Sequence, residues 1–197
     1  MIYFTSDTHF GHANVIRFAG RPWRTIEQMD AALVAGINAR VGMRDELWIL
    51  GDFSYRLGRD EALAIRQSIT CRRVHLVPGN HDRSWAVPEL EGAFLLEPPI
   101  VKIKYEGHRF VCSHYPIMDW EGMRLGSIQL HGHIHSRPEY NEHNRGRGFF
   151  RYDVGVDANG YRPVSIEEVM AFFDGVESDG RVNWCEWDEP LATEEQR

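Results

Sequence analysis

The segment Ile2-Tyr3-Phe4-Thr5-Ser6-Asp7-Thr8-His9 opens with a short apolar run of β type and ends in two side chains that commonly bind metals. The same arrangement recurs four more times: Leu47–Leu50 precedes Asp52, Val74–Val77 precedes Asn80 and His81, Arg109–Ser113 precedes His114, and Ser127–Leu130 precedes His133 and His135. Ligand sites of open α/β sheets lie beyond the carboxyl ends of the strands. We therefore expect these eight side chains to gather at one rim of the fold.

The order of the remaining elements indicates the fold class. Thr25 and Gln28 form a capping-box pattern before an apolar helical stripe, 60–68 has helical character, and Ser165 begins a third helix. Strands alternating with helices pair in parallel, whereas the Tyr105–Arg109 stretch is typical of a hairpin turn. Further strands are predicted at Ile100–Tyr105 and Tyr152–Val156. The sequence predicts an α/β fold: a β-sandwich of two mixed sheets flanked by helices, in four layers (α/β/β/α).

Length and composition are those of an ordinary globular protein. The chain has 197 residues, of which 43% are hydrophobic and 26% charged, and we expect a single domain over 1–197. It has no apolar run of transmembrane length, and the first strand begins too early to leave room for a signal peptide. The three cysteines show no CxxC spacing. These features predict a cytoplasmic protein with reduced thiols.

The charge is unevenly distributed along the chain. From residue 174 onward there are eight acidic and two basic side chains, which account for −6 of the net charge of −7. The body is therefore nearly neutral, and an acidic C-terminal tail is expected from about residue 174. A protein that binds long nucleic acids usually has a broad basic surface. The charge pattern thus disfavours a nucleic-acid-binding module and favours small substrates or short nucleic-acid ends.

The residue types predict a site for two divalent ions. Asp52 is the expected bridging ligand, because a carboxylate has two oxygens and Gly51 permits a sharp turn before it. Asp7 and His9 alternate along a segment expected to be extended, which would direct both side chains to one side, and His133 and His135 do the same. Two ions with two carboxylates and a bridging hydroxide leave a net positive site, which favours a phosphate ester. His81 is the candidate acid for the leaving group, with Asp82 as its expected partner.

Five segments, taken in order, resemble the sequence blocks of the calcineurin-like metallophosphoesterase family. They are Asp7-Thr8-His9, Gly51-Asp52-Phe53-Ser54, Pro78-Gly79-Asn80-His81-Asp82, Cys112-Ser113-His114-Tyr115-Pro116 and His131-Gly132-His133-Ile134-His135, within about residues 2–160. The resemblance implies that one ion is held by Asp7, His9, Asp52 and His135, and the other by Asp52, Asn80, His114 and His133. It also implies that His81 contacts the phosphate and protonates the leaving group. Many members have a further acidic residue after the second block, whereas this chain continues with Phe53-Ser54-Tyr55.

The length resembles that of compact bacterial or phage members without a cap domain, so specificity is expected from short loops. Two loops adjoin the candidate ligands, at 10–17 and 137–151. The second contains four arginines and is predicted to be a mobile basic segment that grips phosphates or is simply solvated. The predicted substrate contacts are His12, Asn80 and Arg137. Trp184 and Trp187 are predicted to pack in a terminal strand, and Asn159–Tyr161 to form a turn.

The sequence thus favours a metal-dependent phosphodiesterase that acts on nucleotides, cyclic nucleotides or short nucleic-acid ends through a metal-bridging hydroxide. The alternatives are a phosphomonoesterase, a nuclease, or a non-catalytic interaction scaffold. Aspartate, asparagine and histidine ligands suit manganese, iron, zinc or nickel, and metal availability decides among them; manganese is the expected ion. The pattern leaves the substrate and the oligomeric state open.

Overall fold

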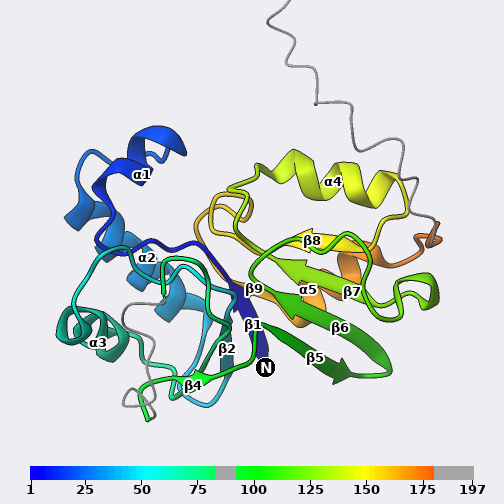
Figure 1. Ribbon diagram of the computed structural model, residues 1–197, viewed down its shortest axis with the longest axis horizontal. Helices are drawn as coiled ribbons and strands as arrows, with labels where there is room; N and C mark the ends of the chain where they lie inside the picture. Colours follow the sequence, from blue (N-terminus) through cyan, green and yellow to red (C-terminus); the bar gives the residue numbers. More distant parts are fainter. Residues whose placement is uncertain (83–91, 180–197) are drawn as a thin grey trace, which may run out of the picture.

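The structure, a computed structural model, describes residues 1–82 and 92–179, which form two β-sheets packed face to face with helices around them (Figure 1). The first sheet has the order β4 (Leu95–Leu96), β3 (Arg73–Leu76), β2 (Glu46–Ile49), β1 (Ile2–Thr5), β9 (Val164–Ser165), and β9 alone runs antiparallel to its neighbour. The second has the order β5 (Ile100–Tyr105), β6 (His108–Ser113), β7 (Ile128–His131), β8 (Arg151–Asp153), and β5 alone is antiparallel. Both sheets are mixed, which confirms the predicted fold class.

Five α-helices and a short 3-10 helix are described: α1 (Ala13–Phe18), α2 (Ile26–Arg40), α3 (Arg59–Ser68), η2 (Met123–Leu125), α4 (Pro138–Gly146) and α5 (Ile166–Phe173). At α2 the Thr25 hydroxyl accepts a hydrogen bond from the Gln28 backbone amide, and at α5 Ser165 and Glu168 form the complete capping box. These side chains satisfy backbone amides that a helix start leaves without partners. Both helices begin where the sequence predicts.

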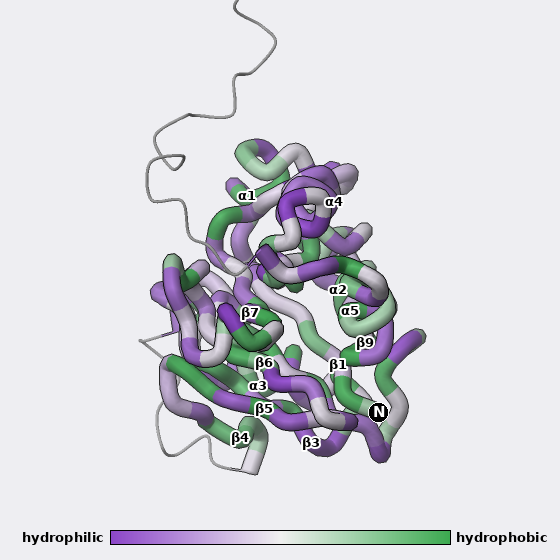
Figure 2. Tube along the Cα trace, turned by 90° about the vertical axis from the view of Figure 1, so that its right-hand side faces the viewer, coloured by the Kyte–Doolittle hydropathy of each residue, from purple (hydrophilic) through white to green (hydrophobic). Residues whose placement is uncertain are grey.

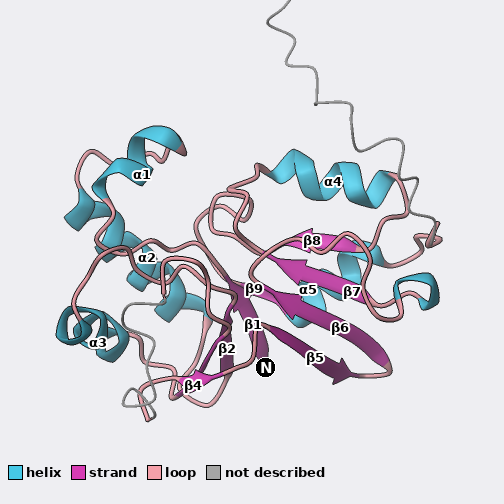
Figure 3. Cartoon of the chain, in the orientation of Figure 1, coloured by secondary structure: helices cyan, strands magenta, loops and turns pink. Residues whose placement is uncertain are grey.

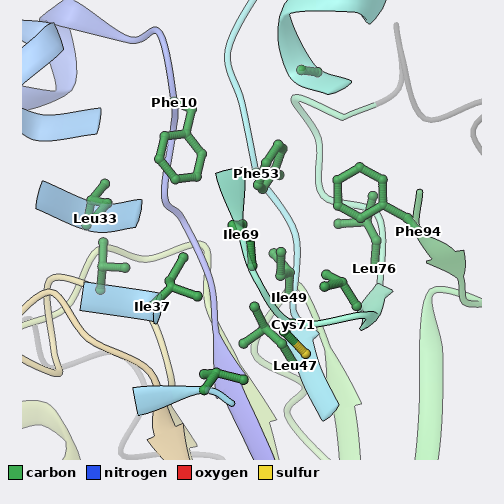
Figure 4. Close-up of a cluster of buried hydrophobic side chains, with 14 of the residues drawn as sticks. Phe10, Leu33, Ile37, Leu47, Ile49, Phe53, Ile69, Cys71, Leu76 and Phe94 are labelled. Atoms are coloured by element: carbon green, nitrogen blue, oxygen red, sulfur yellow. The ribbon is translucent and has the colours of Figure 1, made fainter. Parts of the chain in front are cut away.

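Two cores hold the layers together. Leu47 and Ile49 of β2 point toward α2 and α3, where they join Leu33 and Ile37 in the cluster shown in Figure 4. The intervening Trp48 and the next residue, Leu50, point the other way, into the core between the two sheets. Complete burial of a side chain of this size stabilises a fold by about 1.5–3 kcal/mol. The alternation of β2 therefore anchors the strand before Asp52 on both faces.

The outer face of the second sheet is covered by α4 and by the loop that contains η2. Trp120 and Met123 pack there against Val111 of β6. Figure 2 shows α4 largely in the hydrophilic colour, and its contacts are accordingly polar: the Asn141 side chain donates to Asp153 O at 3.0 Å and accepts from Asp153 N at 2.7 Å. Since no apolar stripe marks α4, its helical character was not predicted from the periodicity.

Some expected boundaries were wrong. Helices α1 and α4 occupy parts of the segments 10–17 and 137–151 that were predicted as loops, and β8 ends at Asp153 rather than at residue 156. The two-residue strands β4 and β9 are too short to carry a period-2 pattern. The turn predicted at 159–161 is present. Trp184 and Trp187, and most of the acidic tail, lie outside the described residues. Among the helices described, none is long and apolar enough for a membrane crossing.

Candidate metal centre

The predicted site residues meet where the carboxyl ends of parallel strands from both sheets face one another. In Figure 1 the loops that follow β1, β7 and β8 come together between α1 and α4, and Figure 3 shows this region as loop. Backbone contacts join the loop after β1 to the loops after β2 and β8. Asp7 N donates to Gly51 O and His9 N to Asp52 O, both at 3.0 Å, and Ser6 forms a bridge with Gly155. The strand ends thus continue as a connected rim.

Five of the candidate ligands have a left-handed backbone, which the sequence did not indicate. The φ angles are 56° at Asp7, 51° at His9, 54° at Asp52, 73° at His133 and 48° at His135. The expectation that 7–9 and 133–135 are extended is therefore wrong, although the side chains do converge. Left-handed residues other than glycine are uncommon and cluster at functional sites, where the surrounding contacts hold them. Here the rim hydrogen bonds constrain Asp7 and His9 in this way.

Three glycines allow the rim to close. Gly51 has a φ of 90°, as the predicted sharp turn requires, and a Cβ there would overlap the His114 ring. A Cβ on Gly79 would overlap the Asp52 carboxylate, and one on Gly132 would overlap Ser6 and the Asp7 carboxylate. Each glycine therefore lies against a candidate ligand from another strand, at a position where any other residue would displace that ligand.

The first group of side chains that can hold a metal ion consists of Asp7, His9 and His135. The Nε2 atoms of His9 and His135 face each other at 3.2 Å. Asp7 Oδ2 accepts a hydrogen bond from His133 N at 2.8 Å, whereas Asp7 Oδ1 is buried without a hydrogen-bond partner among the described residues. A buried oxygen without a partner is costly unless a cation or a donor meets it. The orphaned Asp7 oxygen therefore fits a metal ion in this group.

The second group consists of Asp52, His114 and His133, with Asn80 beside it. His114 Nδ1 lies 2.8 Å from Leu50 O, so it donates to that carbonyl, and the neutral ring then has its lone pair on Nε2. Nε2 faces Asn80 Oδ1 at 3.0 Å. Two acceptors that face each other at this distance repel unless a cation lies between them. The arrangement fits a second metal ion.

Asp52 belongs to the second group and also lies close to the first. Its Oδ2 is 3.6 Å from His9 Nε2 in the first group and 3.6 Å from His114 Nε2 in the second. Its Oδ1 accepts a hydrogen bond from His81 N at 2.9 Å, which fixes the orientation of the carboxylate. One oxygen is therefore equally near both groups, as a bridging ligand has to be.

Burial disfavours the charged forms of two candidate ligands, Asp7 and His9, in the absence of a metal ion. Desolvation raises the pKa of Asp7 to about 8, because its carboxylate is completely buried beside other acidic groups. Desolvation also lowers the pKa of His9, and the neighbouring His135 and Arg21 lower it further. His9 therefore stays neutral, which is the form that binds metals. A divalent ion would compensate the Asp7 carboxylate without requiring protonation of His9.

Asp157 and Arg21 support the first group, and the sequence analysis missed both. Asp157 Oδ2 accepts a hydrogen bond from His135 Nδ1 at 2.8 Å, and Asp157 also pairs with the buried Arg21 at 2.8 Å. Arg21 in turn donates to Asp7 O at 2.7 Å. Burial opposes ionisation of Asp157, but the hydrogen bonds from His135 and Arg21 outweigh it and hold the pKa of Asp157 below its ordinary value. Asp157 directly follows the predicted strand that ends at Val156, so the rule that ligand sites lie beyond the carboxyl ends of strands would have pointed to it.

Replacement of Asp157 by asparagine is expected to weaken metal binding about 10–100-fold, the usual effect of losing a group that orients a metal-bound histidine. Asparagine has nearly the same size but has lost the charge that pairs with Arg21 and makes His135 Nε2 more basic. Titration of the purified variant with manganese measures the affinity. Asp119→Asn, at an exposed position, is the matched control. Unchanged affinity in Asp157→Asn would remove the residue from the metal centre.

Asp82 does not contact His81, contrary to expectation. Its carboxylate is fully buried and accepts hydrogen bonds from the backbone amides of Asp52, Phe53 and Gly79, at 2.7, 3.0 and 2.8 Å. Asp82 thus ties the loop after β2 to the loop after β3. The sequence predicted that it orients the neighbouring His81, but the carboxylate is directed to the backbone amides instead.

His81 lies at the edge of the centre, half-exposed. Its Nε2 is 3.8 Å from Asp52 Oδ2, and its ring packs edge-on against His9 and Tyr55. His12, a predicted substrate contact, is buried: its ring stacks on Tyr55 at 3.7 Å, and its Nδ1 lies 3.4 Å from His9 Nδ1. His81 is thus partly open to solvent at the metal centre, whereas His12 is buried against His9.

The basic segment after the last ligands differs from the prediction. Arg151 is buried and donates to Gln129 and to Ile117 O. Arg145, in the last turn of α4, donates to Phe172 O of α5 at 2.5 Å. Arg137, at the start of α4, is exposed and lines a cleft together with His135. Arg137 is therefore placed beside the centre, and the segment is mostly helix.

Comparison with known proteins agrees with this geometry. Residues 1–163 match the sequence profile of the family described as calcineurin-like phosphoesterase. An uncharacterized protein of Methanocaldococcus jannaschii is 28% identical over 88% of this chain and 91% of its own length. The gene 66 protein of Mycobacterium phage D29 is 30% identical over 89% of this chain and 97% of its own. A crystal structure of a protein of unknown function from Aquifex aeolicus is 26% identical and superimposes with a TM-score of 0.68 over 87% of this chain and 98% of that chain.

Proposed function

The chain belongs to the calcineurin-like phosphoesterase family, and on that basis we propose that it is a phosphodiesterase that acts on nucleotides, cyclic nucleotides or short nucleic-acid ends. The family hydrolyses phosphoric esters and typically binds two divalent metal ions, and this chain has two groups of side chains that can hold them. The preference for diesters and for nucleotide-like substrates is the part that we add.

We assign the ligands as the family resemblance implies. Asp7, His9, Asp52 and His135 would hold one ion, and Asp52, Asn80, His114 and His133 the other. When bound, the two ions would polarise the phosphoryl group and activate the attacking water. The chain's own residues would orient the ester and supply a proton, and we assign the proton donor as His81, which is half-exposed beside Asp52. We propose manganese as the preferred ion, with iron, zinc or nickel as alternatives.

Charge supports a phosphate ester as the substrate. The two carboxylates at the centre, Asp7 and Asp52, offset half of the charge of two divalent ions. Three further carboxylates lie nearby and are already hydrogen-bonded: Asp157 to Arg21 and His135, Asp82 to backbone amides of two loops, and Asp153 to Ser136 and Gly155 N. The ligand carboxylates alone therefore leave part of the positive charge of the two ions for a phosphate anion.

The observation that favours a diester is that exposed aromatic side chains flank both metal groups. The Phe18 ring meets His135 of the first group edge-on at 5.6 Å, and the Tyr115 ring packs on His133 of the second group at 4.4 Å. Both are substantially exposed, at 60% and 45%. A diester has two organic groups on its phosphorus, and each would find an apolar surface here. A monoester has one organic group and one more negative charge to neutralise.

A substrate panel with added manganese tests this proposal. We expect bis(p-nitrophenyl) phosphate and cyclic nucleotides to be hydrolysed with a higher kcat/KM than p-nitrophenyl phosphate. The same panel with iron, zinc and nickel ranks the metals. A preference for the monoester would indicate the alternative of a phosphomonoesterase, and hydrolysis confined to nucleic acid would indicate a nuclease. Inactivity in all arms, together with fewer than two bound ions per chain, would favour an interaction scaffold.

A further inference from the structure

A cleft of about 410 Å³ adjoins the first metal group on the side of α1 and α4. Its lining includes Phe18, Ile134, His135, Arg137, Asp157 and Tyr161. These residues come from three separate segments, namely the end of α1, the loop into α4, and the turn between β8 and β9, which pass close together in Figure 1. The volume lies within the range of about 300–1,000 Å³ typical of small-ligand sites. The cleft has room for an organic group attached to a phosphate at the metal centre.

Phe18 forms an exposed aromatic wall of this cleft. Its side chain ends α1 and is 60% exposed, yet its ring lies edge-on against both His12 and His135, at 5.6 Å each. An exposed phenylalanine contributes little to the core, so its position against two residues of the site points to a ligand. Ile134, 39% exposed, adds an apolar contact between the two candidate ligands His133 and His135.

Tyr161 also lines the cleft and has an unusual backbone. Its φ is 62°, a left-handed value that is a genuine outlier for a bulky residue. A hydrogen bond from Tyr161 N to Val156 O at 2.9 Å and the edge-on packing of its ring on Trp23 at 4.6 Å keep it there. Such strain is retained where a side chain has to be presented at a defined place.

Arg137 provides a cation at the same cleft. Its side chain is exposed and has no hydrogen bond or ion pair to any residue in the described parts of the chain. Its guanidinium reaches toward Gly20, where a Cβ would lie 3.4 Å from Nη2. The planar guanidinium stacks on aromatic systems and also donates to oxygen acceptors. Phe18 and Arg137 therefore offer two surfaces suited to one flat, polar ring.

We infer that this cleft is the subsite for a nucleoside, namely the organic group of the diester that stays on the phosphate after cleavage. The inference rests on the proposed function. His135 belongs both to the first metal group and to the cleft lining, so a phosphate at the centre places its substituent directly at the entrance. His81, the proposed acid, is not among the lining residues, so the group in the cleft is not the one that leaves. An aromatic wall with a cation and polar groups fits a heterocyclic base better than an alkyl or sugar group.

The test compares diesters that share one leaving group. Thymidine 5′-p-nitrophenyl phosphate, phenyl p-nitrophenyl phosphate and methyl p-nitrophenyl phosphate all release p-nitrophenol, so their chemistry is matched. With the manganese-loaded enzyme we expect a KM for the thymidine ester about 5-fold to 150-fold below that of the methyl ester, the range that base stacking on an aromatic side chain provides. The KM of the phenyl ester should be intermediate, because it stacks but lacks the polar edges.

Phe18→Ala should raise the KM of the thymidine ester toward that of the methyl ester, so that the ratio of the two KM values falls toward one. Phe18→Trp should restore the discrimination, whereas Phe18→Leu, which keeps an apolar side chain, should not. Leu125→Ala, which truncates another exposed hydrophobic side chain far from the cleft, is the matched control. Arg137→Ala is also expected to raise the KM of the thymidine ester more than that of the methyl ester.

Two outcomes would overturn the subsite: equal KM values for the thymidine and methyl esters in the unmodified enzyme, or equal values for the thymidine and phenyl esters. If no diester is hydrolysed, the proposed function fails, and the subsite is then judged by binding alone. Calorimetric titration of the manganese-loaded protein with thymidine 5′-monophosphate and with methyl phosphate gives that answer. Tighter binding of the nucleotide, lost in Phe18→Ala, would support the subsite, and equal binding would exclude it.

Discussion

Asp52→Ala is expected to lose both metal ions and all measurable phosphoesterase activity. Asp52 Oδ2 lies 3.6 Å from a histidine nitrogen of each metal group, and we therefore assign it as the bridging ligand. Loss of a group that only orients a ligand weakens metal binding about 10–100-fold, so loss of the bridge should exceed about 100-fold. Metal content after dialysis, and activity with added manganese, measure the two effects.

A change in the fold is distinguished from a change in metal binding by thermal unfolding. In metal-free Asp52→Ala, the loss of repulsion between the Asp52 and Asp7 carboxylates stabilises the fold, whereas the loss of the hydrogen bond from His81 N destabilises it. Added manganese should raise the Tm of the unmodified protein, because a ligand that binds the native state stabilises it. It should raise the Tm of Asp52→Ala much less, and Asp119→Ala should respond like the unmodified protein. Two bound ions in folded Asp52→Ala would refute the bridging assignment.

His81→Ala is expected to retain both ions and to lose turnover about 10²–10⁴-fold, the range that a positioned acid or base contributes. The half-exposed ring of His81 packs beside His9 and Tyr55, and its backbone amide, which holds Asp52, is unaffected by the substitution. Metal content separates this variant from Asp52→Ala. His108→Ala, at an exposed position on β6, is the matched control and should be fully active.

The leaving group distinguishes proton donation from binding. A p-nitrophenolate leaves readily without a proton, whereas an alkoxide requires one, so His81→Ala should lose far more activity toward an alkyl diester than toward a nitrophenyl diester. An equal loss with both would mean that His81 binds the phosphate but does not protonate the leaving oxygen. Loss of metal in His81→Ala would instead place it among the ligands.

The general position of the centre follows from the sequence because strand ends are local features. A buried apolar run such as Leu47–Leu50 has to stop where the polar Asp52 begins, and parallel pairing brings that end beside Asp7 and Asn80. The order of elements that imposes parallel pairing is visible in the sequence. The two mixed sheets and the shared rim were therefore predictable.

Other features depend on contacts between distant residues and were not predictable. The Arg21–Asp157 pair joins positions 136 residues apart, and neither residue has a local pattern that names its partner. Asp82 was predicted to face its neighbour His81, but in the folded chain it holds three backbone amides from two loops. Helix α4 is held by polar contacts of Asn141, which leave no apolar period in the sequence.

The left-handed backbone of the candidate ligands limits how this centre can be transferred to another protein. Asp7, His9, Asp52, His133 and His135 all leave their strands through a conformation that costs energy, and glycines of neighbouring strands fit closely against three of the candidate ligands. A designer who copied only the eight side chains onto regular strand ends of another α/β sandwich would direct them to the wrong places. The transferable unit is the rim itself, with its backbone angles, its three glycines and the buried Asp82 that ties two loops together.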